Sequence, residues 1–549
     1  MTLETFFAKF EQVADAPDAV GKTRELVRHL AVTGKLVAQD RRDESGDLLL
    51  KKINAERLAA VKARKISPTK ALTAVGDEGL SFKRPPGWAA ARLIEMVMEI
   101  QTGPFGSSLH KSDYQLGGTP VINPASLKDG KIAPIEEMAI GRATLKRLEV
   151  FKLCTGDIVM ARRGEMGRCA IVTKNEDGWL CGTGSLVLRM PNSVHAPYLA
   201  MTIGAPMART YLGGASVGTT MQNLNQSILA KMAVGVPPLA EQKRIVAKVD
   251  ELMALCDRLE TQQQERETRH AALARASLAR FADAPTPANL QLLFHPSYAI
   301  SPADLRKTIL ALAVQGKLVP QDPGDEPAEV TFPRLTVAAI DSGEDDCPPH
   351  WLRVPLGGAG RWCGGGTPSK SRPEFWKGSL PWVSPKDMKV LYISDAQDHI
   401  SEAAVEGSSV RLIPPGSLLM VVRGMILARA FPVALAMREV TVNQDMKALQ
   451  LYEPETKEYL LIALRAFEAD VLAAIEHSSH GTCKLKTQFL QDFVVPLPPL
   501  AEQRRIVTKV DQLMALVDEL ETQLAASKAT AANLLSAVVA ELTSSKQSV

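Results

Sequence analysis

The chain has 549 residues, of which 46% are hydrophobic and 23% are charged, and its formal net charge is only +3. This composition is ordinary for soluble globular protein, and the length leaves room for several domains. Because no apolar run reaches about 18 residues, a membrane-spanning helix is excluded. The seven cysteines form no Cys-x-x-Cys pair and no apolar signal segment follows Met1, so we expect a reduced, cytoplasmic protein.

Residues 1–84 are expected to form a mainly helical region. Apolar residues recur at helical spacing just before Gly34, which is typical of the left-handed residue that ends a helix. The eleven residues 30–40 recur at 312–322 with nine identities. A helix over 302–315 is therefore predicted to repeat the N-terminal one.

Residues 85–236 and 348–497 differ from the rest in being rich in glycine, proline, threonine and short apolar runs bounded by turns. This pattern predicts strands with a few helices, and hence two mixed α/β domains. Both segments begin with Pro-Pro-x-Trp, contain Gly-x-(Ile/Leu)-(Val/Leu)-Met-x-x-Arg-Gly, and carry a late Gly-Thr. We expect the two segments to share a fold but to differ in sequence and in the function of their surfaces.

A longer repeat follows each of these segments. Residues 237–262 and 498–523 are identical at 21 of 26 positions, beginning with Pro-Pro-Leu-Ala-Glu-Gln. Apolar residues then recur every three or four positions, which is the seam of a coiled coil, and proline suits the first turn of a helix. We predict long helices over 237–282 and 498–549 that pack on each other.

The seam predicts which side chains the two long helices bury against each other: Val249, Leu252 and Leu259 of the first, and Val510, Leu513 and Leu520 of the second. Two separate surface helices, each packed on its own domain, are the alternative. With either packing, residues 237–347 are expected to form a central region of long helix, linker and helical repeat, and residues 498–549 a C-terminal helical region.

Together these elements predict an α+β protein with two mixed α/β domains, two long helices packed on each other, and a pseudo-two-fold internal repeat. An old gene duplication without functional meaning would leave the same pattern. If the repeat has a function, it matches a pseudo-symmetric partner, of which double-stranded DNA is the commonest. The small net charge permits local basic patches but does not indicate them.

The sequence contains no complete catalytic or metal-binding motif. Gly21-Lys22-Thr23 has the end of a phosphate-binding loop, but Ala16 stands where the first glycine is required. Asn123-Pro124-Ala125 lacks the second proline and the aromatic residue of an amino-methyltransferase loop. His477 and His480 are three residues apart, but the sequence around them does not complete the ligand spacing of a known zinc site. We therefore expect neither catalytic residues nor metal ligands in this chain.

The remaining polar loops suit recognition. Arginine can fork onto guanine and Asn or Gln onto adenine, whereas Lys and Ser more often hold phosphate. In the first segment the candidates for DNA binding are Ser107, Ser108, Lys111, Asn123, Arg162, Arg163, Gln222, Asn223 and Asn225. In the second they are Thr367, Ser369, Lys370, Arg372, Ser384, Lys386, Asp387, Arg423, Asn443, Gln444, Lys484 and Lys486.

A solvated or turn-capping role is the alternative for each of these residues. Arg163 and Arg423 are the strongest candidates because they stand at equivalent predicted strand ends. Four tryptophans of the two segments are expected in the core rather than as stacking platforms: Trp88, Trp351, Trp376 and Trp382.

The motifs resemble the specificity (S) subunit of Type I restriction–modification enzymes over nearly the whole chain. The doubled Pro-Pro-Leu-Ala-Glu-Gln-x-Arg-Ile-Val, the Gly-Lys-Leu-Val-x-Gln-Asp pair, and Gly366-Thr367-Pro368-Ser369 leading into Phe375-Trp376 carry the resemblance. It implies two target recognition domains, each reading one half of a bipartite, asymmetric DNA site. It also implies that the repeated helices form an antiparallel coiled coil that separates these domains. The conserved regions are then expected to dock two methyltransferase (M) subunits, which motor–nuclease (R) subunits join.

One departure concerns the first segment, where Gly103-Pro104-Phe105-Gly106-Ser107-Ser108 stands in place of Gly-Thr-Pro-Ser. The resemblance implies no cofactor on this chain, with S-adenosylmethionine on the M subunits and ATP and Mg on the R subunits. A self-contained methyltransferase–specificity fusion and a coiled-coil adaptor that binds only protein are the alternatives.

Overall fold

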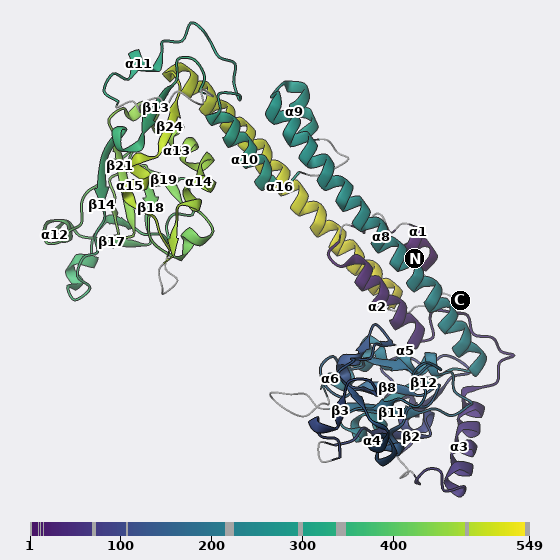
Figure 1. The fold of residues 1–549 in the computed structure, drawn as a ribbon. Helices are drawn as coiled ribbons and strands as arrows, with labels where there is room; N and C mark the ends of the chain where they lie inside the picture. Colours follow the sequence, from purple (N-terminus) through teal and green to yellow (C-terminus); the bar gives the residue numbers. More distant parts are fainter. Residues whose placement is uncertain are drawn as a thin grey trace. The chain divides into compact units, whose positions relative to one another are not determined.

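The computed structural model (Figure 1) describes residues 3–8, 10, 13–14, 16–68, 73–105, 108–214, 224–294, 300–335, 347–477 and 483–543. The chain forms two compact units, one of Met1–Gln264 with Ser527–Val549 and the other of Glu265–Ala526. Each unit holds one mixed α/β domain, the beginning of one long helix and the end of the other. No helix of the described ranges is long and apolar enough to cross a bilayer.

Short helices precede each α/β domain in the sequence. They are α1 (Leu3–Ala8), α2 (Ala19–Val32) and α3 (Gly46–Lys62) in the first unit, and α9 (Pro287–Leu293), α10 (Pro302–Val314) and α11 (Ala328–Thr331) around the second repeat. Gly34 follows α2 at φ 71° and Gly316 follows α10 at φ 67°, as predicted. A Cβ on either glycine would lie 2.4 Å from a proline Cγ, of Pro85 and Pro348 respectively. Both the backbone and the packing therefore require glycine there.

The first α/β domain contains two four-stranded sheets. One, antiparallel throughout, has the order β2-β11-β8-β9, and the other has the order β10-β4-β7-β3 with a parallel β10–β4 pair. All residues of β8 are buried, as an apolar run in mid-sheet should be. The elements are β2 (Glu99–Thr102), β3 (Tyr114–Gln115), β4 (Thr119–Ile122), β5 (Leu127–Lys128), β6 (Lys131–Ile132), β7 (Ala139–Ile140), α4 (Arg142–Arg147), β8 (Ile158–Ala161), β9 (Cys169–Ile171), β10 (Leu180–Cys181), β11 (Ser185–Arg189), α5 (Ala196–Gly204), α6 (Pro206–Gly214) and α7 (Gln226–Lys231).

The second α/β domain has a five-stranded sheet of order β14-β21-β18-β19-β16 and a three-stranded sheet of order β17-β15-β20. The central strand β18 is again fully buried. The elements are β14 (Gly360–Gly364), β15 (Leu380–Val383), β16 (Tyr392–Ile393), β17 (Asp398–Ile400), α12 (Glu402–Glu406), β18 (Leu418–Val421), β19 (Val433–Ala436), β20 (Thr441–Val442), β21 (Met446–Leu451), α13 (Lys457–Ala466), α14 (Glu468–Ala473), β22 (Glu476–His477), β23 (Cys483–Lys484) and α15 (Thr487–Asp492).

The first and last strands of each domain pair with each other. Strand β1 (Ala89–Arg92) pairs antiparallel with β12 (Ala233–Val236), and β13 (Leu352–Pro355) pairs in the same way with β24 (Val494–Leu497). Each domain therefore leaves and rejoins the helical part of its unit at one place.

The two long helices are α8 (Leu239–Asp283) and α16 (Leu500–Thr543), close to the predicted bounds. In the first unit, Cys256 of α8 shares an apolar cluster with Leu535 near the end of α16. In the second unit, Phe281 near the end of α8 shares a cluster with Val517 of α16. The start of each helix thus lies with the end of the other, which confirms the antiparallel arrangement (Figure 1).

The predicted seam partners are wrong. Val249 and Leu252 are buried with α2 and Trp88 in the first unit, whereas Val510 and Leu513 are buried in the core of the second. The starts of the two helices belong to different units, and these repeated positions contact their own α/β domain and its short helix instead.

Candidate DNA-recognition site

The Pro-Pro-Leu-Ala-Glu-Gln motif joins the long helix to the α/β domain through buried hydrogen bonds. In the first unit, the Glu241 carboxylate accepts from Trp88 Nε1 at 2.9 Å and from Gln39 Nε2 at 3.3 Å. The next residue, Gln242, donates from Nε2 to the carbonyl of Pro237 at 3.0 Å. The Pro-Pro-x-Trp, Gly-Lys-Leu-Val-x-Gln-Asp and Glu-Gln motifs therefore meet at one point.

The second unit repeats this arrangement. Glu502 accepts from Trp351 Nε1 at 2.9 Å and from Gln321 Nε2 at 2.7 Å. Burial raises the pKa of both Glu241 and Glu502. We call the contacts of these two glutamates the frame contacts; because their polar groups bond within the chain, they hold the domains and are not a ligand site.

Most candidates of the second domain lie where its strands end. The backbone N–H of Asn443, after β20, donates to Val383 at the end of β15 (2.9 Å). The N–H of Arg423, after β18, donates to the carbonyl of Asp445 (3.1 Å), and Arg423 forms an isolated bridge with Lys484. Thr367, after β14, donates from its hydroxyl to Gln444. Residues far apart in the sequence are thus brought to one end of the sheets.

Several of these side chains are engaged within the domain. Asp387 accepts from the N–H and hydroxyl of Ser384 at 2.8 and 2.9 Å and, through its other oxygen, from the N–H of Gln397 at 2.9 Å. Lys486 pairs with Glu476. Arg372 lies over the ring of Phe375 at 5.2 Å, and the hydroxyls of Ser369 and Ser371 are 2.7 Å apart.

Four exposed candidates of the second domain make no side-chain hydrogen bond or ion pair with the part of the chain that the structure describes. They are Lys370, Lys386, Arg423 and Lys484. These cations are available to an external ligand.

The first domain has a similar strand-end surface built from other residues. Arg162, after β8, donates from its backbone N–H to Gly184 and from Nε to the carbonyl of Leu224, both at 2.9 Å. Burial and the neighbouring Arg163 lower the pKa of Arg162. The Arg162 guanidinium therefore fixes the residues before α7, while Arg163 is exposed.

The other candidates of the first domain are spread over it. Asn123, after β4, donates from Nδ2 to the sulfur of Met138 at 3.0 Å, and Asn225 caps α7 by accepting from Ile228 N–H at 2.8 Å. The Ser108 carbonyl accepts from Arg147 at 2.6 Å, and Lys111 is exposed in a short 3-10 turn. Ser107, Gln222 and Asn223 lie outside the described residues.

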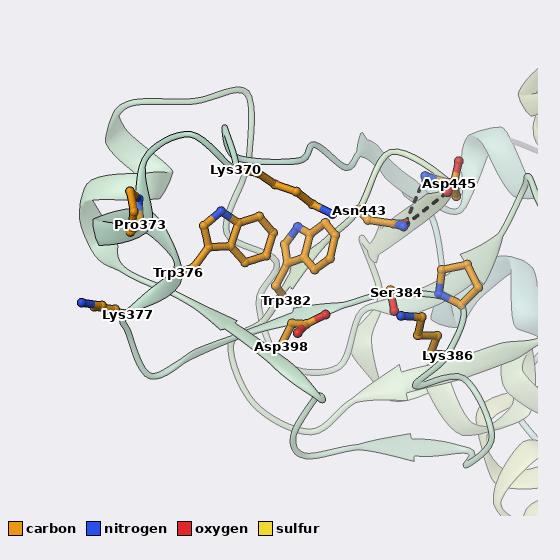
Figure 2. A pocket seen from close by; sticks show the side chains of 11 residues that line it. Lys370, Pro373, Trp376, Lys377, Trp382, Ser384, Lys386, Asp398, Asn443 and Asp445 are labelled. Atoms are coloured by element: carbon orange, nitrogen blue, oxygen red, sulfur yellow. Dashed lines mark hydrogen bonds between the residues drawn. The ribbon is translucent and has the colours of Figure 1, made fainter.

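The second domain contains a hollow of about 800 Å³ that was not predicted from the sequence, and we call it the tryptophan hollow (Figure 2). Its wall contains Trp376 and Trp382, whose ring centroids lie 5.1 Å apart with the planes at 82°. Trp382 is only 8% exposed, as expected of core, but Trp376 is half-buried and faces the hollow. The other lining residues are Lys370, Pro373, Lys377, Ser384, Pro385, Lys386, Asp398, Asn443 and Asp445. The crowding of tryptophan and lysine between residues 370 and 382 was the available signal.

Among the described residues, no three His, Cys, Asp or Glu side chains are placed to hold a metal ion. Burial raises the pKa of the Cys169 and Cys181 thiols to about 12, so neither is a ready nucleophile. The two strand-end surfaces offer cations, amides and aromatic rings.

Comparison with known proteins agrees with this description. The sequence matches the Type I restriction modification DNA specificity domain twice, over residues 87–267 and 350–527. It is 39% identical over 166 residues to the specificity subunit of the Type I restriction enzyme EcoR124I/EcoR124II of Escherichia coli, covering 30% of this chain and 41% of that protein. It is 25% identical over 568 aligned residues to the EcoAI specificity subunit of Escherichia coli, covering 94% of this chain and 93% of that protein.

Among solved structures, the HsdS subunit from Thermoanaerobacter tengcongensis is 21% identical, with a TM-score of 0.43 over 85% of this chain and 99% of that chain. The family match is the stronger finding, because its two segments cover more than half of the sequence and each contains most of one α/β domain and the start of the long helix that follows it. Specificity subunits are the non-catalytic DNA-recognition components of their complexes. The chain therefore belongs to the specificity subunits of Type I restriction–modification systems.

Proposed function

We propose that each α/β domain binds one half of a bipartite, asymmetric site in double-stranded DNA. Residues 85–236 are then recognition domain 1 and residues 348–497 recognition domain 2. One observation carries the proposal: the two α/β domains have equivalent frame contacts, but the side chains at their strand ends differ. This combination suits two domains that read two different sequences.

The strand-end residues divide by chemistry into base-reading and phosphate-holding groups. Arg163 and Arg423 follow equivalent buried strands and are exposed, so we assign them to guanine, whose O6 and N7 accept a forked pair of bonds. Asn443 and Gln444 are assigned to adenine or to positioning Arg423. The lysines are assigned to phosphate oxygens, which fix register without carrying sequence information.

The helices outside the recognition domains are proposed to dock two M subunits, and R subunits to join through that M–S core. S-adenosylmethionine would then bind to the M subunits, and ATP with Mg to the R subunits. This chain would contribute only the recognition of the DNA sequence. The complex would work in the cytoplasm, where cellular DNA is accessible.

The methylated positions in the DNA of a cell that produces the whole complex test this function. A split motif with methyl-adenine in both halves is the expected result, and it would also give the sequence that each domain reads. A single continuous motif, or methylation unchanged by deletion of this chain, would contradict the proposal.

A further inference from the structure

We propose that recognition domain 2 holds one nucleotide, turned out of the DNA duplex, in the tryptophan hollow. This inference rests on the proposed binding of DNA by that domain. Besides reading base edges in a groove of the DNA, the domain would then have a separate binding site for one extruded base.

The hollow has the size and the rigid aromatic wall that such a site needs. Its volume of about 800 Å³ lies within the ~300–1,000 Å³ typical of pockets that bury a small molecule. The indole N–H of Trp382 donates to the carbonyl of Gly366 at 2.9 Å, and that of Trp376 to Ser369 at 3.3 Å. Because the backbone of the Gly366–Ser369 loop holds both rings, they present fixed faces and edges rather than free donors.

The polar groups of the hollow suit the edge of a base. Asn443 is 6% exposed, and its Oδ1 accepts from the N–H of Asp445 at 3.0 Å, so the side-chain amide is held in one orientation. The carboxylates of Asp398 and Asp445 also line the hollow (Figure 2). Carboxylates accept hydrogen bonds from exocyclic amino groups. Adenine, cytosine and guanine carry such a group and thymine does not, so the site favours one of the first three.

Three lysines at the hollow suit the phosphates on either side of that base. Lys370, Lys377 and Lys386 form no ion pair with any carboxylate that the structure describes. In Figure 2, Lys370 extends past the indole rings toward Asn443, whereas Lys377 points away. With three lysines and two carboxylates, the lining of the hollow has a net positive charge. This charge attracts the phosphates of a nucleotide and would not attract a neutral aromatic ligand.

A base within the duplex cannot use this wall. Its two faces are covered by its neighbours, and only an unstacked base can lie against an aromatic side chain. Recognition domain 1 contains only Trp88 and Trp179, and Trp88 is buried in its frame contact. We therefore expect an extruded nucleotide in the half-site of recognition domain 2 alone.

The test measures binding of the full chain to its duplex while the partner of each base in turn is replaced by an abasic residue. Removing the partner lowers the cost of extrusion, so binding should tighten about tenfold or more at one position, opposite adenine, cytosine or guanine. Trp376→Ala should abolish most of that tightening. Trp362→Ala, which removes a half-buried tryptophan of the same domain outside the hollow, should keep it.

A second variant tests the hollow in case Trp376→Ala fails to fold. Asp398 is exposed on strand β17, so Asp398→Asn should fold, and it should reduce the tightening because an amide presents one acceptor where the carboxylate presents two. No tightened position, or unchanged tightening in both variants while the intact duplex still binds, overturns the extruded nucleotide and leaves the proposed function standing. The extruded nucleotide would also be overturned if free deoxynucleoside monophosphates competed with the duplex for binding while no abasic position tightened binding. Failure of the parent chain to prefer its own duplex would remove both proposals.

Discussion

Recognition domains 1 and 2 are alike where they meet the long helices and unlike where their strands end. Trp88 with Glu241 and Trp351 with Glu502 make the same 2.9 Å hydrogen bond. Arg244 pairs with Asp43 at 2.7 Å, and the equivalent Arg505 with Asp325 at 2.6 Å. The difference teaches that the attachment is fixed by buried, mutually dependent contacts, whereas the reading surface is free to vary.

The loop after the first strand of the sheet shows this variation. In domain 2, Thr367 of the Gly-Thr-Pro-Ser loop donates to Gln444, and the loop backbone holds both tryptophans of the hollow. In domain 1, Pro104 accepts from the hydroxyl of Thr183 at 3.0 Å, and Phe105 is 64% exposed. A residue at the strand ends of one domain therefore has no automatic counterpart in the other.

The largest effect is expected from a charge in the shared attachment. Leu513 of α16 is 1% exposed, and Leu513→Asp should destabilise the protein by about 3–5 kcal/mol because it buries an unpaired charge. Leu516→Asp is the matched control, since Leu516 is 46% exposed on the same helix. Denaturant unfolding measures both, and equal midpoints for the two variants would show that this face of α16 carries no packing.

A smaller and local effect is expected at the strand ends. Arg423→Ala should weaken binding of the domain 2 half-site by about 1–3 kcal/mol and relax one base position, and Arg163→Ala should do the same in the other half. Competition binding against single-base variants at two salt concentrations measures this.

A phosphate contact would instead weaken all sequences alike and lower the salt slope by about one. Arg361→Ala, an exposed arginine near the start of β14, is the control and should change neither quantity. If the strand-end variants behave like this control, the assignment of both arginines is wrong.

The smallest effect is a pH dependence of stability that arises equally in both frame contacts. Because burial raises the folded-state pKa of Glu241 and Glu502 above the ordinary 4.5, the folded chain binds protons more readily than the unfolded chain in the window above that value. This contribution to stability is complete below the ordinary pKa and declines as pH rises through the raised one.

Glu241→Gln with Glu502→Gln should flatten that decline while keeping an oxygen acceptor for each indole. Unfolding midpoints across the window measure the slope. Glu519→Gln, at an exposed position of α16, should leave it unchanged. A double variant with the parent's slope would show that other groups cause the pH dependence.

The sequence predicted much of the helical architecture because periodicity and glycine ends are local signals. The starts of α8 and α16 each lie two residues from the predicted positions, and Gly34 and Gly316 adopt the expected conformation. The residues that pack against the apolar stripe of α8 could not be predicted, because either α16 or α2 with Trp88 can bury such a stripe.

The reading residues were harder to predict for a related reason. Residue type does not reveal whether Asp387 faces DNA or caps Ser384, since either role needs an exposed-loop carboxylate. Trp376 was expected in the core, yet the turn between Pro373 and Lys377 leaves it half-buried beside a hollow. Such placements depend on contacts between distant segments, which no local pattern encodes.

Exchange of residues 348–497 for the corresponding segment of another specificity subunit tests most directly whether attachment and reading are separate. The methylated motif of the complex is measured before and after the exchange. We predict that only one half of the motif changes, while the other half keeps its sequence, because recognition domain 1 and its frame contact are untouched. A change in both halves, or in neither while methylation persists, would contradict this account.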